Sequence, residues 1–227
     1  MVGEHQMKIT TYVISYNRPS YLRQCVEALQ HDQRLDIIIV DNNSDNVNLN
    51  EYVNWNKMGE NYGHRVCWSQ GLVPSDRPYI VTDCDIIVPY KLPWLDLLLS
   101  GLDTMPQYNK FGLGLNVRHI PDSNPYKSDI IKHETKTLYR RELPDGRFVE
   151  MPVDTTLALY RTGYTNYSIW GTDSNHYTGI CKSVRTVAPF EAKHLTWHMT
   201  ESERQGEENR RYLKSLKPKS THWSEKR

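Results

Sequence analysis

The segment at residues 79–89 constrains the fold of this chain more than any other. It reads YIVTDCDIIVP, so a run rich in β-branched residues ends in two carboxylates, Asp83 and Asp85, before a proline breaks it. This pattern predicts a buried strand with acids at its carboxyl end, which is where open α/β sheets bind ligands. Because residues i and i+2 of an extended chain share a face, we expect both carboxylates to face one ligand. Two oxygen donors suit Mg²⁺ or Mn²⁺ better than zinc; a pair of capping or turn aspartates is the alternative interpretation.

Composition narrows the class of protein. The 227 residues suffice for one domain with a sizeable core, and a net charge of +1 favours neither nucleic acid nor an anionic membrane as the main partner. Four cysteines without a Cys-x-x-Cys pair indicate neither a zinc site nor a disulfide framework, and they favour a reducing, cytoplasmic compartment. No apolar run has the length of a signal peptide or membrane span. The bias toward 15 Tyr and 6 Trp over 3 Phe is typical of sugar-binding surfaces and of wet protein interfaces.

The amino-terminal residues predict a strand–helix–strand unit. Residues 9–15 (ITTYVIS) read as a strand, and a helix opens at Pro19 or Ser20 with apolar residues at helical spacing, namely Tyr21, Leu22, Cys25, Val26 and Leu29. Residues 35–40 (LDIIIV) read as a second strand, whose apolar run is typical of a parallel sheet covered on both faces. Polar residues follow it from Asp41 onward. A right-handed crossover places both strand ends at one edge of the sheet.

Weaker patterns predict the remaining elements. We expect helices at 48–56, at 65–68 with Gly71 ending it, at 93–102, at 130–141 and from 201 to about 216, followed by a tail. We expect strands near 55–60, at 110–118, at 155–160 and at 183–187, and a hairpin that turns at Asp145-Gly146 between 141–143 and 147–151. Residues 120–129 and 163–178 read as loops.

Four motifs then resemble a known family. VISYNRP at 13–19, IIVDNNS at 38–44, NYG at 61–63 and TDCD at 82–85 are similar, in order and spacing, to the signatures of family 2-like glycosyltransferases with the GT-A fold and a DxD motif. The resemblance covers residues 8–90. It implies a single α/β GT-A (Rossmann-like) domain with a mostly parallel central sheet flanked by helices and a C-terminal helical extension. Residues 1–90 would be the nucleotide-sugar-binding half, 91–200 the acceptor-binding half, and 201–227 a helix and tail.

The resemblance also implies a donor site at the sheet edge. Asp41 would accept a hydrogen bond from the base, expected to be uracil, and Asp83 would approach the ribose and the metal. Asp85 would ligate the Mn²⁺ or Mg²⁺ that bridges both phosphates. Further contacts to the base and phosphates are expected from Ser15, Tyr16, Arg18 and Arg65. A surface salt bridge is the alternative role for Arg18 and for Arg65.

Sugar transfer needs a base on the acceptor side, because the acceptor hydroxyl must lose a proton. Asp154 precedes an apolar strand, where related enzymes offer this carboxylate, and Asp173 is the second candidate. The usual Glu-Asp pair of the family is missing, so an N-cap or turn role is the alternative for Asp154. The His-Leu-Thr-Trp-His segment resembles a C-terminal metal-binding segment, with His194 as metal ligand and His198 behind it. A structural histidine is the alternative. Trp170 and Trp197 are candidates for sugar stacking, with core packing as their alternative.

The activity implied is metal-dependent transfer of a hexose or deoxyhexose from a UDP-sugar to a hydroxyl of a glycan or glycoconjugate, as in polysaccharide biosynthesis. A haloacid-dehalogenase-like phosphohydrolase also uses Asp-x-Asp after a strand, but normally after the first strand. A sugar nucleotidyltransferase would begin with a Gly-rich loop instead of SYNR at 15–18. A catalytically inactive sugar-nucleotide-binding or glycan-binding module is the third alternative, which the intact Asp83 and Asp85 disfavour.

Overall fold

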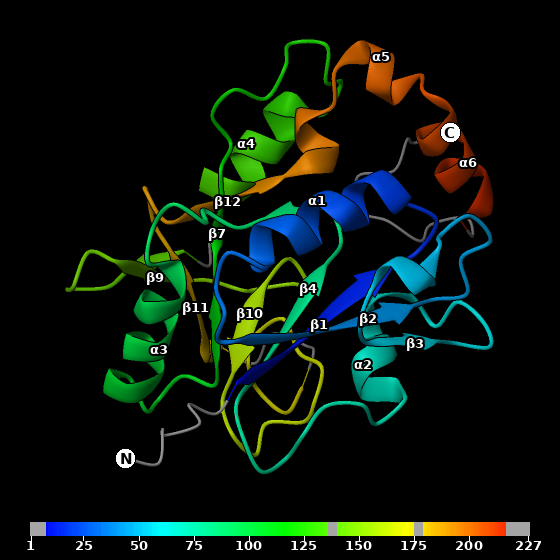
Figure 1. Cartoon of the computed structure of the whole chain (residues 1–227). Coiled ribbons are helices and arrows are strands. Elements are labelled where there is room, and N and C mark those ends of the chain that lie inside the picture. The colour runs from blue at the N-terminus through cyan, green and yellow to red at the C-terminus, as the bar shows by residue number, and fades with distance from the viewer. Residues whose placement is uncertain (1–7, 136–139, 175–178, 217–227) are drawn as a thin grey trace.

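The computed structural model describes residues 8–135, 140–174 and 179–216. Within them a nine-stranded sheet has the order β3-β2-β1-β4-β10-β6-β11-β9-β8, and a three-stranded sheet has the order β5-β12-β7 (Figure 1). The strands are β1 (Ile9–Ser15), β2 (Leu35–Asp41), β3 (Trp55–Lys57), β4 (Tyr79–Asp83), β5 (Ile86–Ile87), β6 (Lys110–Gly112), β7 (Gly114–Leu115), β8 (Arg141–Glu142), β9 (Phe148–Glu150), β10 (Ala158–Tyr160), β11 (Ser183–Thr186) and β12 (Glu191–His194). The α-helices are α1 (Pro19–Leu29), α2 (Val66–Ser69), α3 (Trp94–Thr104), α4 (Lys127–Thr135), α5 (Glu201–Arg204) and α6 (Glu207–Ser215).

The first half of the large sheet is parallel. β1 pairs in parallel with β2 and with β4, and β2 pairs in parallel with β3. Ser15 lies opposite Asp41, and Ile14 lies opposite Asp83, so the carboxyl ends of the three strands meet at one edge. The predicted strand–helix–strand unit is confirmed.

The second half of the large sheet contains both parallel and antiparallel strand pairs. β10 runs antiparallel to β4 and β6, β11 is parallel to β6, and the hairpin predicted at Asp145-Gly146 joins β8 and β9. The predicted fold class, an α/β domain with a large sheet between helices, is confirmed. The parallel half is the half that the motifs encode.

Side chains that alternate along the strands contribute to a hydrophobic core on each face of the sheet. Val13 of β1 packs with Leu22 of α1 and Leu98 of α3, whereas the neighbouring Tyr12 and Ile14 pack on the other face. Val66 and Cys67 of α2 join that second core. Helices α1 and α2 therefore cover opposite faces (Figure 1).

The small sheet depends on a bend in the chain after Gly112. The strand expected at 110–118 is wrong in its length, because it divides into β6 and β7 and ends at Leu115. Gly114 lies so close to the Thr186 carbonyl that a Cβ atom would overlap it, which explains the glycine at this position. β7 pairs with β12, and β12 pairs with β5 so that His194 lies opposite Ile86.

Three further expectations need correction. The helix expected at 48–56 is a single 3-10 turn at Leu49–Glu51, and β3 follows it directly. Helix α4 begins at Lys127, inside the expected loop. The C-terminal helix is broken into α5 and α6, because Gly206 takes an extended conformation as the N-cap of α6. The predicted tail at 217–227 and loop residues 175–178 lie outside the described residues.

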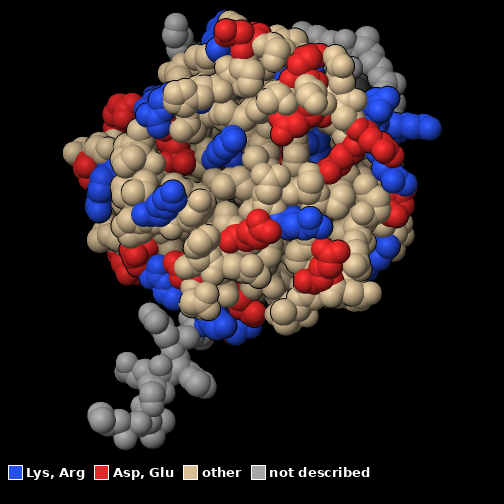
Figure 2. Space-filling model, turned by 45° about the horizontal axis from the view of Figure 1, so that its top comes forward, with Lys and Arg blue, Asp and Glu red and all other residues tan. Residues whose placement is uncertain are grey.

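The face of the molecule in Figure 2 carries charges of both signs. Lys and Arg side chains are interspersed with Asp and Glu over the face in Figure 2, in agreement with the net charge of +1. None of the helices described in the structure has the length and apolar composition needed to cross a membrane.

Candidate functional site

The Asp83-Cys84-Asp85 segment forms a turn that is fixed from three sides. β4 ends at Asp83, and Cys84 and Asp85 lead by a turn into β5. The Cys84 N–H donates to the Ile14 carbonyl (3.0 Å), the Asp83 N–H to the Thr155 carbonyl (2.8 Å), and the Leu195 N–H to the Asp85 carbonyl (2.8 Å). The expectation that the chain stays extended through Asp85 is therefore wrong. Backbone hydrogen bonds to three separate segments hold it in a turn instead.

Asp83 points toward the segment after β9. Its Oδ2 accepts a hydrogen bond from the Thr155 hydroxyl at 2.7 Å. Burial raises the pKa of Asp83 well above its usual range, and the negative charge of Asp85 adds to this effect. Without a cation beside it, this carboxyl group therefore favours the neutral form.

Asp85 lies among hydrogen-bond donors and positive charge. Its Oδ2 accepts from the Thr196 hydroxyl at 2.6 Å, and His194 Nδ1 lies 3.6 Å from the same oxygen. Burial alone would raise the pKa of Asp85, but His194, Arg18 and the Thr196 hydroxyl outweigh it and lower the pKa. Burial also lowers the pKa of His194, although the negative charge of Asp85 acts to raise it. His194, Arg18 and the Thr196 hydroxyl together therefore favour the ionised form of Asp85.

Asp83, Asp85 and His194 are of the ligand types that a divalent cation takes, but they do not form a complete ligand set. His194 Nδ1 is buried without a hydrogen-bond partner among the described residues and lies 3.6 Å from Oδ2 of the half-buried Asp85, and the half-buried Asp83 stands two residues before Asp85 in the turn. Across residues 8–135, 140–174 and 179–216, however, no three His, Cys, Asp or Glu side chains converge closely enough to hold a metal ion alone. A cation at Asp83, Asp85 and His194 would thus need oxygen ligands from a diphosphate or water, which is usual for Mg²⁺ sites.

Asp154 is held beside this turn by a tyrosine. Its Oδ1 accepts from the Tyr167 hydroxyl at 2.8 Å and from the Thr155 N–H at 2.9 Å. Burial alone would raise the pKa of Asp154, but the Tyr167 hydrogen bond and the charge of Lys110 lower it, so the carboxylate is ionised at neutral pH. Arg65 lies over the Tyr167 ring, 4.7 Å from its centroid.

The second candidate base lies elsewhere. Asp173 is exposed, as Asp154 is, but its charge acts on Tyr164, a residue of the second core. Asp154, by contrast, shares Thr155 with Asp83 and raises the pKa of Asp83 by its charge. The structure thus brings Asp154, and not Asp173, to the Asp83 carboxylate.

The predicted base-binding residues at the ends of β1 and β2 are mostly buried. Both oxygens of Asp41 accept hydrogen bonds from Ser44, at 2.8 Å from its N–H and 2.5 Å from its hydroxyl. The Ser15 hydroxyl is buried and has no hydrogen-bond partner within the described part of the chain. Tyr16 is half-buried, with its hydroxyl 3.5 Å from the Ser215 carbonyl.

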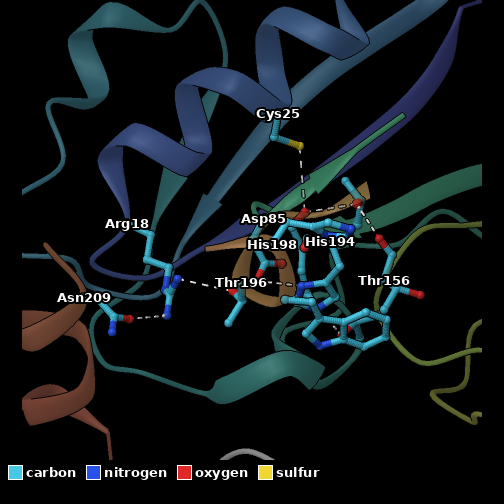
Figure 3. Close-up of polar contacts among 12 residues, drawn as sticks. Arg18, Cys25, Asp85, Thr156, His194, Thr196, His198 and Asn209 are labelled. Carbon is cyan, nitrogen blue, oxygen red and sulfur yellow. Dashed lines mark hydrogen bonds and ion pairs between the residues drawn. The ribbon is translucent and has the colours of Figure 1, made fainter. Parts of the chain in front are cut away.

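Arg18 faces the metal-binding candidates but is also occupied. Its guanidinium donates to the Thr196 hydroxyl (3.3 Å) and to Asn209 Oδ1 of α6 (3.2 Å), as Figure 3 shows. It lies 3.7 Å from the centroid of the Tyr212 ring. The side chain is buried, so the surface salt bridge weighed for Arg18 is wrong.

The two tryptophans are core residues. Trp170 is 6% exposed and Trp197 4% exposed, so the sugar-stacking prediction is wrong for both and the core-packing alternative holds. Trp197 stacks on His194 with ring centroids 4.5 Å apart, which fixes the imidazole. Both ring nitrogens of His198 face backbone carbonyls, those of His194 and Arg118.

The sequence reasoning missed four residues that the structure places at the site. Thr155 and Thr196 each donate to one of the two aspartates, Tyr167 donates to Asp154, and Asn209 accepts from Arg18. Thr196 lay within a segment already singled out for its histidines, and Thr155 follows Asp154. No local pattern marked Tyr167 or Asn209.

Comparisons with known proteins bear on the fold of the chain. The model of glycosyl transferase family 2 matches residues 10–62. No curated protein matches the chain. Among solved structures, a mannosyltransferase from Pyrobaculum calidifontis in complex with GDP-Man and Mn²⁺ is similar with a TM-score of 0.51 and 12% identity, over 89% of this chain and 66% of its own.

Two other solved structures are less similar. Glucosyl-3-phosphoglycerate synthase from Mycobacterium tuberculosis has a TM-score of 0.43 and 12% identity, over 68% of this chain and 57% of its own. TarS from S. aureus, residues 1–349, has a TM-score of 0.44 and 16% identity, over 69% of this chain and 47% of its own. The chain thus spans less than two thirds of the length of each of these three proteins. The family model matches residues 10–62 alone, and the likeness to the mannosyltransferase shows the fold: the chain has a GT-A fold.

Proposed function

We propose that this chain is a metal-dependent glycosyltransferase that moves a hexose or deoxyhexose from a UDP-sugar to a hydroxyl of a glycan or glycoconjugate. The observation that carries the proposal is the position of His194 beside Asp85. Asp83 and Asp85 follow one another at the end of the parallel strand β4, and His194 Nδ1, which has no hydrogen-bond partner among the described residues, lies 3.6 Å from Asp85 Oδ2. Oxygen and imidazole ligands at such an edge suit Mn²⁺ and a nucleoside diphosphate.

The proposed roles follow from the hydrogen bonds at the site. When bound, a divalent cation would offset the charge that develops on the leaving diphosphate. Thr155 and Thr196 each occupy one oxygen of Asp83 and Asp85, which orients both carboxylates. Asp154 is ionised, because Tyr167 and Lys110 outweigh its burial, and it takes the proton of the acceptor hydroxyl as the base.

The position of Asp83 and Asp85 in the sheet also bears on the alternative activity, that of a haloacid-dehalogenase-like phosphohydrolase. β4 lies inside the sheet next to β1, after two strands with polar ends, and the chain has a GT-A fold. A haloacid-dehalogenase-like phosphatase would need a nucleophile after its first strand. We therefore favour group transfer over phosphoryl hydrolysis.

A panel of UDP- and GDP-sugars with Mn²⁺ tests the proposal by measuring slow release of the nucleoside diphosphate. We expect release from at least one UDP-sugar, loss of release in Asp85→Asn, and wild-type release in Asp76→Asn, whose side chain is 75% exposed. Release that persists in Asp85→Asn, or its absence with every donor, contradicts the proposal.

A further inference from the structure

Helix α6 reaches the proposed metal site through a chain of polar contacts. Arg18 is 6% exposed, and its guanidinium bridges Asn209 of α6 and Thr196. The Thr196 hydroxyl in turn donates to Asp85 at 2.6 Å. Figure 3 shows Asn209, Arg18, Thr196 and Asp85 in this order. Asn209 thereby holds the Arg18 guanidinium next to the proposed position of the donor phosphates.

The Asn209 amide is oriented for this contact. Its Nδ2 donates to the Arg204 carbonyl at 2.8 Å, across the break between α5 and α6, so its Oδ1 is the atom that faces Arg18. Asn209 itself is 6% exposed. The Tyr212 ring, one turn further along α6, lies 3.7 Å from the Arg18 guanidinium carbon. An acceptor and an aromatic face therefore hold one charged group.

Other contacts hold α6 over the same edge of the sheet. Glu208 Oε1 accepts from the Ser20 N–H at 3.3 Å, and Arg211 pairs with Asp45 at 3.5 Å in the loop after β2. The helix thus lies beside the first turn of α1 and the loop that follows β2 (Figure 1). The Arg211 contact is solvent-exposed and does not involve Arg18, so it offers a matched control.

We propose that Asn209 and Tyr212 are positioning residues of the donor site, which hold Arg18 against Thr196 and Asp85 so that α6 sets the affinity for the nucleoside diphosphate. The inference rests on the proposed function. A free arginine side chain loses considerable rotamer freedom when it orders around a phosphate, and α6 has already removed that freedom. The ordered guanidinium also adds positive charge where two aspartates and a diphosphate meet.

Titration calorimetry with UDP or GDP in the presence of Mn²⁺ tests this proposal. We expect Asn209→Ala and Tyr212→Ala to weaken binding roughly tenfold, the order of a hydrogen bond to a charged group, while Arg211→Ala stays within about twofold. A double-mutant cycle gives the decisive readout. If Asn209 acts through Arg18, then Asn209→Ala has no further effect on affinity in an Arg18→Gln background.

The outcomes separate the two proposals. If the wild-type protein binds neither nucleotide, the proposed function and this inference both fail. If the wild type binds and Asn209→Ala binds within twofold, or if the loss persists in the Arg18→Gln background, only the role of α6 is overturned. Thermal melting and circular dichroism of each variant report whether α6 stays folded. Should Asn209→Ala not fold, Tyr212→Ala in the same cycle with Arg18→Gln gives the test.

Discussion

Lys110 is a fully buried cation directly behind the proposed acceptor side. Its Nζ donates to the Val153 carbonyl at 2.5 Å and to the Ser168 carbonyl at 3.3 Å, and it lies 5.0 Å from the Tyr160 ring centroid. Burial lowers the pKa of Lys110 to about 7, although Asp154 opposes the shift. The lysine thereby ties together the two segments that carry Asp154 and Tyr167.

This shift predicts that stability depends on pH. Between pH 7 and about 8.5 the unfolded chain keeps the Lys110 proton, because its pKa is near 10.4, whereas the folded chain loses it. The unfolded state binds more protons, so the free energy of unfolding rises with pH, by at most about 1.4 kcal/mol per pH unit. Urea titrations should show this rise in the wild type and not in Lys110→Met. An equal slope in both proteins would contradict a lowered pKa at Lys110.

At Asp154 the prediction concerns turnover. Asp154→Asn removes the proton acceptor but keeps a side chain that accepts from Tyr167, so we expect unchanged affinity for the nucleoside diphosphate and a loss of about 10²- to 10⁴-fold in kcat. Steady-state kinetics and calorimetry measure the two quantities. The same change at Asp173 tests the second candidate, and a loss of turnover confined to that variant would reverse the assignment.

Among the elements, β12 positions His194, the proposed metal ligand, beside Asp85. Its antiparallel pairing with β5 brings His194 opposite Ile86, the residue after Asp85, and its parallel pairing with β7 fixes its other end. The bend at Gly112–Gly114 sends β7 into this small sheet instead of continuing the large one. The position of His194 therefore depends on Gly114, which lies in a strand far from it in sequence.

Gly114→Ala should therefore disturb both folding and the site. A Cβ atom there would overlap the Thr186 carbonyl oxygen, so β7 must shift, and we expect a loss of roughly 2–3 kcal/mol in the free energy of unfolding. Gly59→Ala is the control, because a Cβ at Gly59 meets no atom within 4 Å. Denaturant unfolding and Mn²⁺-dependent nucleotide binding measure the two effects. Wild-type values for both in Gly114→Ala would show that β7 does not position β12.

At the scale of the molecule, the sheet joins two halves with different pairing. The parallel half, β3-β2-β1-β4, presents its strand ends to the proposed donor, and β10 and the segment around Asp154 continue the site from the mixed half. Helix α6 packs beside this edge, where Asn209 contacts Arg18 and Arg211 pairs with Asp45. The proposed donor, metal and base residues thus come from the whole length of the chain.

Metal removal should act on the whole molecule through linkage. With UDP present at about 100 times its Kd, binding to the folded state adds roughly 2.7 kcal/mol to the free energy of unfolding. We expect UDP with Mn²⁺ to raise the melting temperature, EDTA to abolish the rise, and added Mn²⁺ to restore it. An equal rise with UDP and EDTA would mean that nucleotide binding needs no metal.

Much of the parallel half was predictable from the sequence. The apolar runs of β1, β2 and β4 and the helical spacing of α1 are local patterns, and each polar strand end follows directly from where its apolar run stops. The polar residues Asp41, Asp83 and Asp85 could be placed at one edge for this reason. The predicted limits of β7, α4 and α6 failed where a glycine or a backbone partner elsewhere in the chain decided them.

The sequence by itself determined which side chains are candidates for the proposed chemistry, because carboxylates and imidazoles at strand ends are visible as residue types. Only the tertiary structure decided which of them meet. Thr196 reaches Asp85 across 111 residues and Asn209 reaches Arg18 across 191, through strand pairing and helix docking that no local pattern encodes. The same long-range packing buried Trp170 and Trp197, since core space and not residue type decides whether an aromatic ring is free.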